Sequence, residues 1–139
     1  MATMKDFNTF LSTIYLGDRA CKSLLIDGWR GIVELTVNLV SRIRDPSGNW
    51  NYYSDEDIEN GIVVFSGIEA ISLDPPGRFP NDTIEDLVVE RIGDHGLVEF
   101  RLTATQVVEN GNAYKVIVRI TARDVYLVDP INPQTEIRT

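Results

Sequence analysis

Few residues of this chain have the types and spacing that catalysis or metal binding requires. The single histidine, His95, lies in a predicted glycine-flanked turn, and no nucleophile or carboxylate motif accompanies it. The single cysteine, Cys21, has neither a second cysteine nor a nearby histidine with which to hold zinc. We therefore predict a non-catalytic protein that uses no metal and no cofactor.

The densest group of acidic and aromatic side chains lies in the segment 50–59. Its acids alternate as in a calcium-binding loop, but Asn60 stands at the sixth position, where that loop needs glycine. Aromatic rings supply large rigid contact area and carboxylates attract basic partners, so we predict a protein contact here. The same aromatics could instead fold back as a lid on the sheet edge. The candidate contact residues are Trp50, Tyr52, Tyr53, Asp55, Glu56, Asp57 and Glu59.

A second, weaker candidate contact is the proline-rich segment 74–82, which carries Arg78 and Phe79. Its prolines exclude a central strand, because proline cannot donate a hydrogen bond to a sheet. The segment is therefore a stiff loop. Arg78 and Phe79 either reach a partner from this loop or pin the loop to the protein.

Hydrophobic periodicity predicts the elements that position these loops. Val33, Leu35, Val37 and Leu39 alternate with polar residues, which is the period of a strand. The apolar run 24–26 precedes them across an Asp-Gly turn, so we expect an antiparallel hairpin. Further strands are predicted over 61–73, 84–92, 97–104 and 114–128, with bulges at Ser66-Gly67 and near Arg123-Asp124.

Residues 3–16 carry apolar side chains at spacings of three and four, which predicts a helix that Thr3 caps and Gly17 ends. The expected fold class is α+β and mostly antiparallel β. About six strands form a bent sheet, as a half-barrel or a sandwich, and the N-terminal helix packs on it. We expect a single domain over 1–139, with a β-rich body over 18–128 and a loose tail over 129–139.

Charge and hydropathy limit the partners. The chain has 13 Lys and Arg against 21 Asp and Glu, which gives a net charge of −8. This charge argues against binding to nucleic acid and favours a basic protein partner. No apolar run approaches the roughly 20 residues of a membrane span, and no secretory signal is recognisable, so we expect a cytoplasmic protein. An exposed sheet edge would also allow a homodimer.

The order of four stretches is informative: Tyr15–Arg19 at the end of the predicted helix, Ile26–Leu35 across the first hairpin, then Phe65–Ile68 and Ile120–Val125. This order resembles small uncharacterised bacterial proteins of β-rich type, some groups of which are placed with the immunity proteins of polymorphic toxin systems. The resemblance implies a bacterial cytoplasmic protein that binds and neutralises a partner.

We therefore predict a protein-binding module, immunity-like, whose partner is basic. The alternative is a small β-barrel that holds an apolar small molecule in an unfilled interior. The inward-facing residues that would line such an interior are Phe65, Phe100, Tyr114 and Val118.

Overall fold

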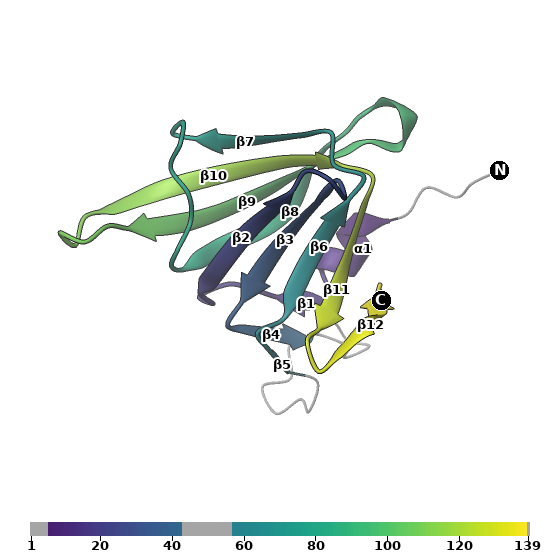
Figure 1. The fold of residues 1–139 in the computed structure, drawn as a ribbon, viewed down its shortest axis with the longest axis horizontal. Helices are drawn as coiled ribbons and strands as arrows, with labels where there is room; N and C mark the ends of the chain where they lie inside the picture. The colour runs from purple at the N-terminus through teal and green to yellow at the C-terminus, as the bar shows by residue number, and fades with distance from the viewer. Residues whose placement is uncertain (1–5, 43–56, 139) are drawn as a thin grey trace.

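The computed structural model describes residues 6–42 and 57–138 of the chain. Within them, three antiparallel sheets and one short helix are arranged as Figure 1 shows. The largest sheet has the order β12-β11-β6-β3-β2. Its strands are β2 (Cys21–Asp27), β3 (Ile32–Val37), β6 (Ile62–Ser66), β11 (Asp124–Asp129) and β12 (Asn132–Ile137).

The second sheet has the order β7-β10-β9-β8. It consists of β7 (Ala70–Asp74), β8 (Ile84–Ile92), β9 (Val98–Val107) and β10 (Ala113–Ala122). The smallest sheet, with the order β1-β4-β5, consists of β1 (Ile14–Tyr15), β4 (Leu39–Arg42) and β5 (Ile58–Glu59). The prediction of a mostly antiparallel β fold is confirmed. The prediction of about six strands in one bent sheet is wrong, because the described residues form twelve strands in three sheets.

Two predicted long strands turn out to cross from one sheet to another. The run 61–73 divides into β6 and β7, and the run 114–128 divides into β10 and β11. Both crossings lie at one corner, where the Arg123 N–H donates to the Ser66 carbonyl at 3.0 Å. Gly67 turns the chain there with a φ of 62°. The two predicted bulges are therefore corners between sheets.

The predicted strand over 33–39 is interrupted at Asn38. The Asn38 side-chain oxygen accepts the Ala20 N–H at 2.8 Å, and the Asn38 N–H donates to the Ala20 carbonyl at 3.1 Å. Val37 and Val40 are both fully buried, although they are three positions apart and would lie on opposite faces of one continuous strand. Leu39 therefore does not continue the buried face of β3, and β4 joins the smallest sheet instead.

The helix α1 (Phe7–Leu11) is shorter than predicted. Asp6 caps it by accepting the Thr9 N–H at 3.0 Å. The hydroxyls of Ser12 and Thr13 donate to carbonyls of the last turn at 2.6 and 2.7 Å, which ends the helix well before Gly17. The predicted cap at Thr3 lies outside the described residues.

The C-terminal segment is also more ordered than predicted. The sequence predicted a loose tail over 129–139, but β12 pairs with β11. One Arg138 nitrogen, Nη1, lies 2.7 Å from each carboxylate oxygen of Asp124. The Arg138 guanidinium also lies over the Tyr126 ring, 4.8 Å from its centroid. These contacts attach the last strand to the sheet.

One hydrophobic core is shared by the three sheets and α1. The Phe100 ring of β9 lies edge-to-face with Phe65 of β6 at 5.2 Å and with Phe7 of α1 at 5.6 Å between centroids. Phe65, Phe100 and Val118, three of the four residues assigned above to an apolar ligand, are fully buried in this core. The core therefore fixes the relative positions of α1 and β8, beside which the candidate site lies.

Candidate functional site

A groove of about 350 Å³ lies between the chain that follows α1 and the beginning of β8. Four apolar side chains line it together with Tyr15 and Gly17, and three carboxylates complete its wall. The apolar residues are Leu11, Ile14, Leu16 and Leu87, and the carboxylates are those of Asp18, Glu85 and Asp86. We call this feature the acidic groove.

Backbone pairing brings the two walls of the acidic groove together. The Asp18 N–H donates to the Ile84 carbonyl at 2.9 Å, and the Ile84 N–H donates to the Arg19 carbonyl at 2.7 Å. Because Ile84 is fully buried, this pairing is attached to the core. Asp18 itself has a φ of 61°, in the left-handed region that residues other than glycine seldom adopt.

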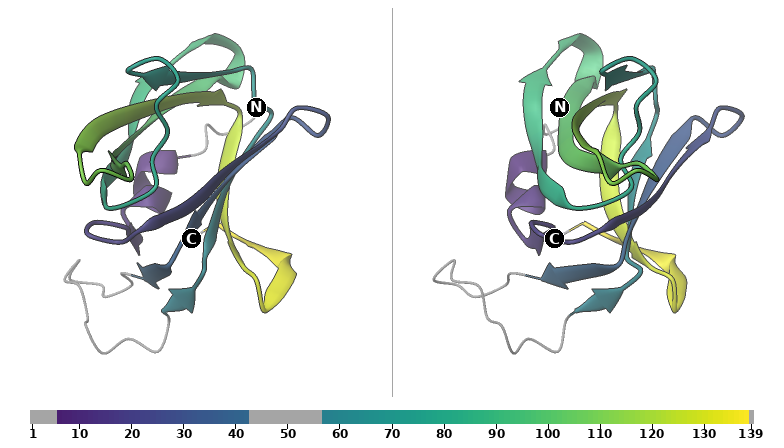
Figure 2. Two further views of the ribbon diagram at one scale, coloured as in Figure 1. Left: turned by 60° about the vertical axis from the view of Figure 1, so that its left-hand side comes forward. Right: turned by 90° about the vertical axis from the view of Figure 1, so that its left-hand side faces the viewer.

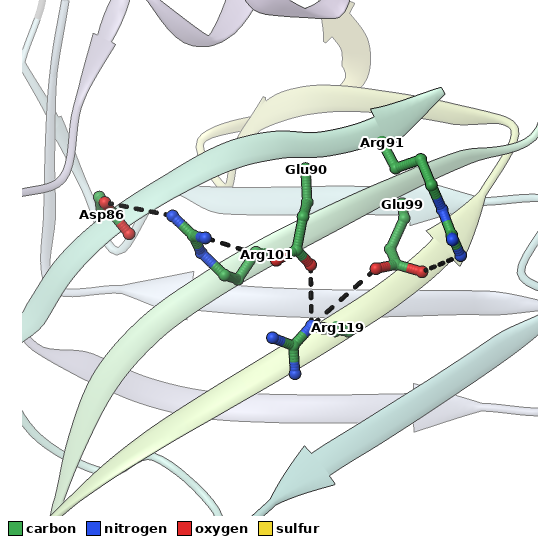
Figure 3. Close-up of polar contacts among 6 residues, drawn as sticks. All are labelled: Asp86, Glu90, Arg91, Glu99, Arg101 and Arg119. Atoms are coloured by element: carbon green, nitrogen blue, oxygen red, sulfur yellow. Dashed lines mark hydrogen bonds and ion pairs between the residues drawn. The ribbon is translucent and has the colours of Figure 1, made fainter. Parts of the chain in front are cut away.

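Asp86 lies at one end of an ion-pair network on the outer face of the β8-β9-β10 region (Figure 3). Its Oδ2 is 4.0 Å from Nη2 of Arg101, whose other terminal nitrogen lies 3.4 Å from Glu90 Oε1. The Asp86 Oδ1 is buried and has no hydrogen-bond donor among the described residues. Since the side chain is still 45% exposed, the charge of this carboxylate is only weakly compensated.

The other arginines of the network are engaged by Glu90 and Glu99. Arg119 Nε lies 2.8 Å from Glu90 Oε2 and 3.9 Å from Glu99 Oε1, and Arg91 Nη2 lies 3.1 Å from Glu99 Oε2 (Figure 3). The hydrogen bond from Arg119 lowers the pKa of Glu90. Arg101 and Arg119 stand directly opposite each other on β9 and β10, so Glu90 compensates two like charges.

The other two carboxylates of the acidic groove are compensated even less. Glu85 lies 3.9 Å from Lys115, and both side chains are 67% exposed, so water screens this pair. Asp18 makes no side-chain hydrogen bond or ion pair within the described part of the chain. The groove therefore combines an apolar lining with negative charge that the described part of the protein neutralises only weakly.

The structure covers the predicted contact segment only in part. Trp50, Tyr52, Tyr53, Asp55 and Glu56 lie outside the described residues. Asp57 and Glu59 are exposed, Glu59 lies in β5, and neither lines the acidic groove.

The second predicted contact has a structural role for one of its two residues. The Arg78 guanidinium lies 3.7 Å from the centroid of the Tyr114 ring and donates to Gln106 Oε1 at 3.2 Å. Asn81 anchors the same loop by exchanging hydrogen bonds of 2.8 and 2.9 Å with the Val107 backbone. Arg78 therefore pins the loop to the sheet, whereas Phe79 is 54% exposed.

Sequence reasoning missed the acidic groove, because its walls come from distant parts of the chain. Glu85 and Asp86 are adjacent in a predicted strand, and alternation alone would place their side chains on opposite faces. A register shift between Ile84 and Asp86 brings both to the same region. The only local signal is the acidic pair itself at the beginning of a strand.

Among residues 6–42 and 57–138, no three histidine, cysteine, aspartate or glutamate side chains gather closely enough to hold a metal ion. In the same ranges, no helix combines the length and the hydrophobicity of a membrane span.

The fold and the site together define a mostly antiparallel β protein with an acidic surface groove. A family model matches residues 4–139, and the chain therefore belongs to the family of unknown function DUF6258. No curated protein and no solved structure matches the chain.

Proposed function

We propose that this protein is a non-catalytic protein-binding module whose acidic groove takes a basic segment of a partner protein. The observation that carries the proposal is the weakly compensated carboxylate of Asp86, whose side chain is 45% exposed and whose ion-pair partner in the protein, the Arg101 guanidinium, lies 4.0 Å away. A lysine or arginine from a partner would supply the missing positive charge.

The lining of the groove suits the shape of such a side chain. Lysine and arginine lay their aliphatic stems on apolar surface and keep the charged end beside carboxylates. Leu11, Ile14 and Leu87 offer the apolar surface, and Asp18 and Asp86 offer the carboxylates. The net charge of −8 would in addition steer a basic partner toward the protein.

The resemblance to immunity proteins supports a neutralising role in the bacterial cytoplasm, with a basic toxin as the partner. The sequence-based contact segment, which runs from Trp50 to Glu59, is acidic as well and would recognise the same kind of partner.

The experiment uses a capped peptide of alternating leucine and arginine, and a second peptide with glutamate in place of arginine. Binding is measured by calorimetry at low and high salt, and by the amide shifts of Gly17 and Leu87. The wild-type protein should bind only the arginine peptide, and more weakly at high salt. The double variant Asp18→Asn and Asp86→Asn should bind roughly tenfold more weakly, or about 1.4 kcal/mol.

The matched control is the double variant Glu69→Gln and Glu109→Gln, which removes the same charge from two exposed positions outside the groove. It should bind the arginine peptide like the wild type. Equal binding by the groove variant and the wild type would contradict the proposal, and so would an equal loss in both double variants.

A further inference from the structure

The outer edge of β2 is a free sheet edge in its C-terminal half. The beginning of this edge is occupied, because the Cys21 N–H donates to the Asp82 carbonyl at 2.8 Å and Ala20 forms a bridge with Thr83. From Leu24 to Asp27, β2 pairs with β3 on one side, and no described strand pairs with the other side. Figure 2 shows that the β2–β3 hairpin projects away from the second sheet.

The register shows which backbone groups this edge presents. The Val37 N–H donates to the Gly61 carbonyl at 2.9 Å, so Val37 bonds on the β6 side of β3. Leu24 stands opposite Leu35 and Ile26 opposite Val33. These two β3 residues lie two and four positions before Val37, so they also direct their backbone groups toward β6. In an antiparallel ladder, a β2 residue opposite one of these β3 residues directs its own N–H and C=O away from β3. Leu24 and Ile26 therefore present unpaired donors and acceptors at the edge.

The side chains from Leu24 to Ile26 are apolar and uncharged, although Lys22 and Asp27 stand on either side of this run. Leu25 is 50% exposed and Ile26 is 55% exposed. Trp29, at the tip of the same hairpin, is 98% exposed. Natural edge strands usually carry charge or proline that prevents pairing, but the run from Ser23 to Ile26 has neither.

We propose that a second copy of this chain docks on this edge, with the two β2 strands antiparallel about a two-fold axis at Leu25. Leu24 then stands opposite Ile26 of the second copy, and Leu25 opposite its own equivalent. The outward groups of Leu24 and Ile26 form about four backbone hydrogen bonds between the copies. Outward-directed groups occur at every second residue of each edge. They face each other across the two copies only when the two-fold axis passes through a residue, such as Leu25, and not between two residues.

Charge favours a second copy as the occupant. The charged residues of β2 are Lys22 near one end and Asp27 at the other. Antiparallel pairing about Leu25 places Lys22 of each copy opposite Gly28 of the other, one residue from Asp27. Within each copy, Asp27 lies 2.8 Å from Arg30 and Lys22 donates to Asn60 at 2.8 Å, so the ends of the paired strands carry balanced charge although each chain carries a charge of −8. Because the self-paired strand is polar at both ends and apolar between them, each copy is complementary to the other. This docking is independent of the acidic groove.

The first experiment measures the mass of the protein in solution by sedimentation at increasing concentration. The weight-average mass should rise from 15.6 kDa toward twice that value, with half-association between about 1 µM and 1 mM. The variant Leu25→Lys should remain monomeric, because it places two like charges opposite each other on the axis. The control variant Ile92→Lys alters a 54% exposed residue of β8 and should associate like the wild type.

The second experiment tests the register by cross-linking with oxidised glutathione. At a non-hydrogen-bonded pair the Cα atoms lie about 4.5 Å apart, which a disulfide can span. Leu25→Cys should therefore form a covalent dimer much faster than Ile92→Cys. A wild-type protein that stays monomeric up to about 1 mM would overturn the proposal. A Leu25→Lys variant that is folded by circular dichroism and still dimerises, or equal cross-linking of the two cysteine variants, would overturn it too.

Discussion

Burial of Cys21 should make the stability of this protein depend on pH in the alkaline range. The residue is 1% exposed, and its Sγ lies 4.0 Å from the Ser23 carbonyl oxygen. Burial raises the pKa of the Cys21 thiol from its ordinary value of 9.0 to about 11. The physical cause is desolvation, which penalises the thiolate more than the neutral thiol.

The direction of the effect follows from which state loses the proton first. The unfolded chain releases the thiol proton near pH 9.0, whereas the folded chain holds it to about pH 11. The stabilisation is therefore fully present below pH 9.0 and is lost as the pH rises through the folded pKa. The total loss approaches roughly 3 kcal/mol, of which about 1 kcal/mol falls between pH 8 and pH 10.

The assay is urea unfolding of the wild type and of Cys21→Ala at pH 8, 9 and 10, with a reductant present. Tyrosine and lysine titrate in both proteins, so their effects cancel in the difference between the two free energies of unfolding. The alanine variant starts lower because of the cavity that it creates. Its disadvantage should shrink by about 1 kcal/mol between pH 8 and pH 10. A difference that stays constant with pH would refute this reasoning.

Three further predictions concern the core, the corner and the last strand. Phe100→Ala should lower the free energy of unfolding by about 3–5 kcal/mol in urea, because the ring is fully buried between Phe7 and Phe65. Gly67→Ala should lower it by about 1–3 kcal/mol, because φ is 62° and a Cβ would lie 2.9 Å from the Arg123 Cβ. Gly28→Ala, with no atom within 4 Å of its Cβ, should change it by less than about 0.5 kcal/mol. Arg138→Met should speed amide exchange in β12 but not in β9, because it removes the contacts with Asp124.

The hairpins show what local sequence could predict. The β2–β3 hairpin, the β9–β10 hairpin at Asn110-Gly111, and the strand over 84–92 all form where the sequence predicted them. Each rests on alternation within a few residues and on turn residues that tolerate unusual φ values. Gly111, for example, has a φ of 88°. These properties belong to short stretches and are visible without any long-range contact.

Strand ends and sheet membership could not be predicted in the same way. A bulge within a strand and a corner between two sheets both shift the alternating pattern of buried residues by one position. The hydrophobic pattern around Ser66-Gly67 is therefore the same in either case. The hydrogen bond between Arg123 and Ser66 distinguishes them, and it joins residues far apart in the chain. The strand β1, which replaces the second half of the predicted helix, and the added strand β12 depend likewise on pairing with β4 and β11.

The sequence by itself determined the antiparallel β character, the hairpins and the acidic charge of this protein, because those follow from local alternation and composition. Only the tertiary structure decided where acidic charge is left uncompensated. The densest acids are visible in the sequence, but attraction depends on how closely each carboxylate is paired with a cation. Pairing across β8, β9 and β10 engages Glu90 and Glu99 at short distances, whereas Asp86 has its arginine at 4.0 Å and Asp18 has no ion pair among the described residues.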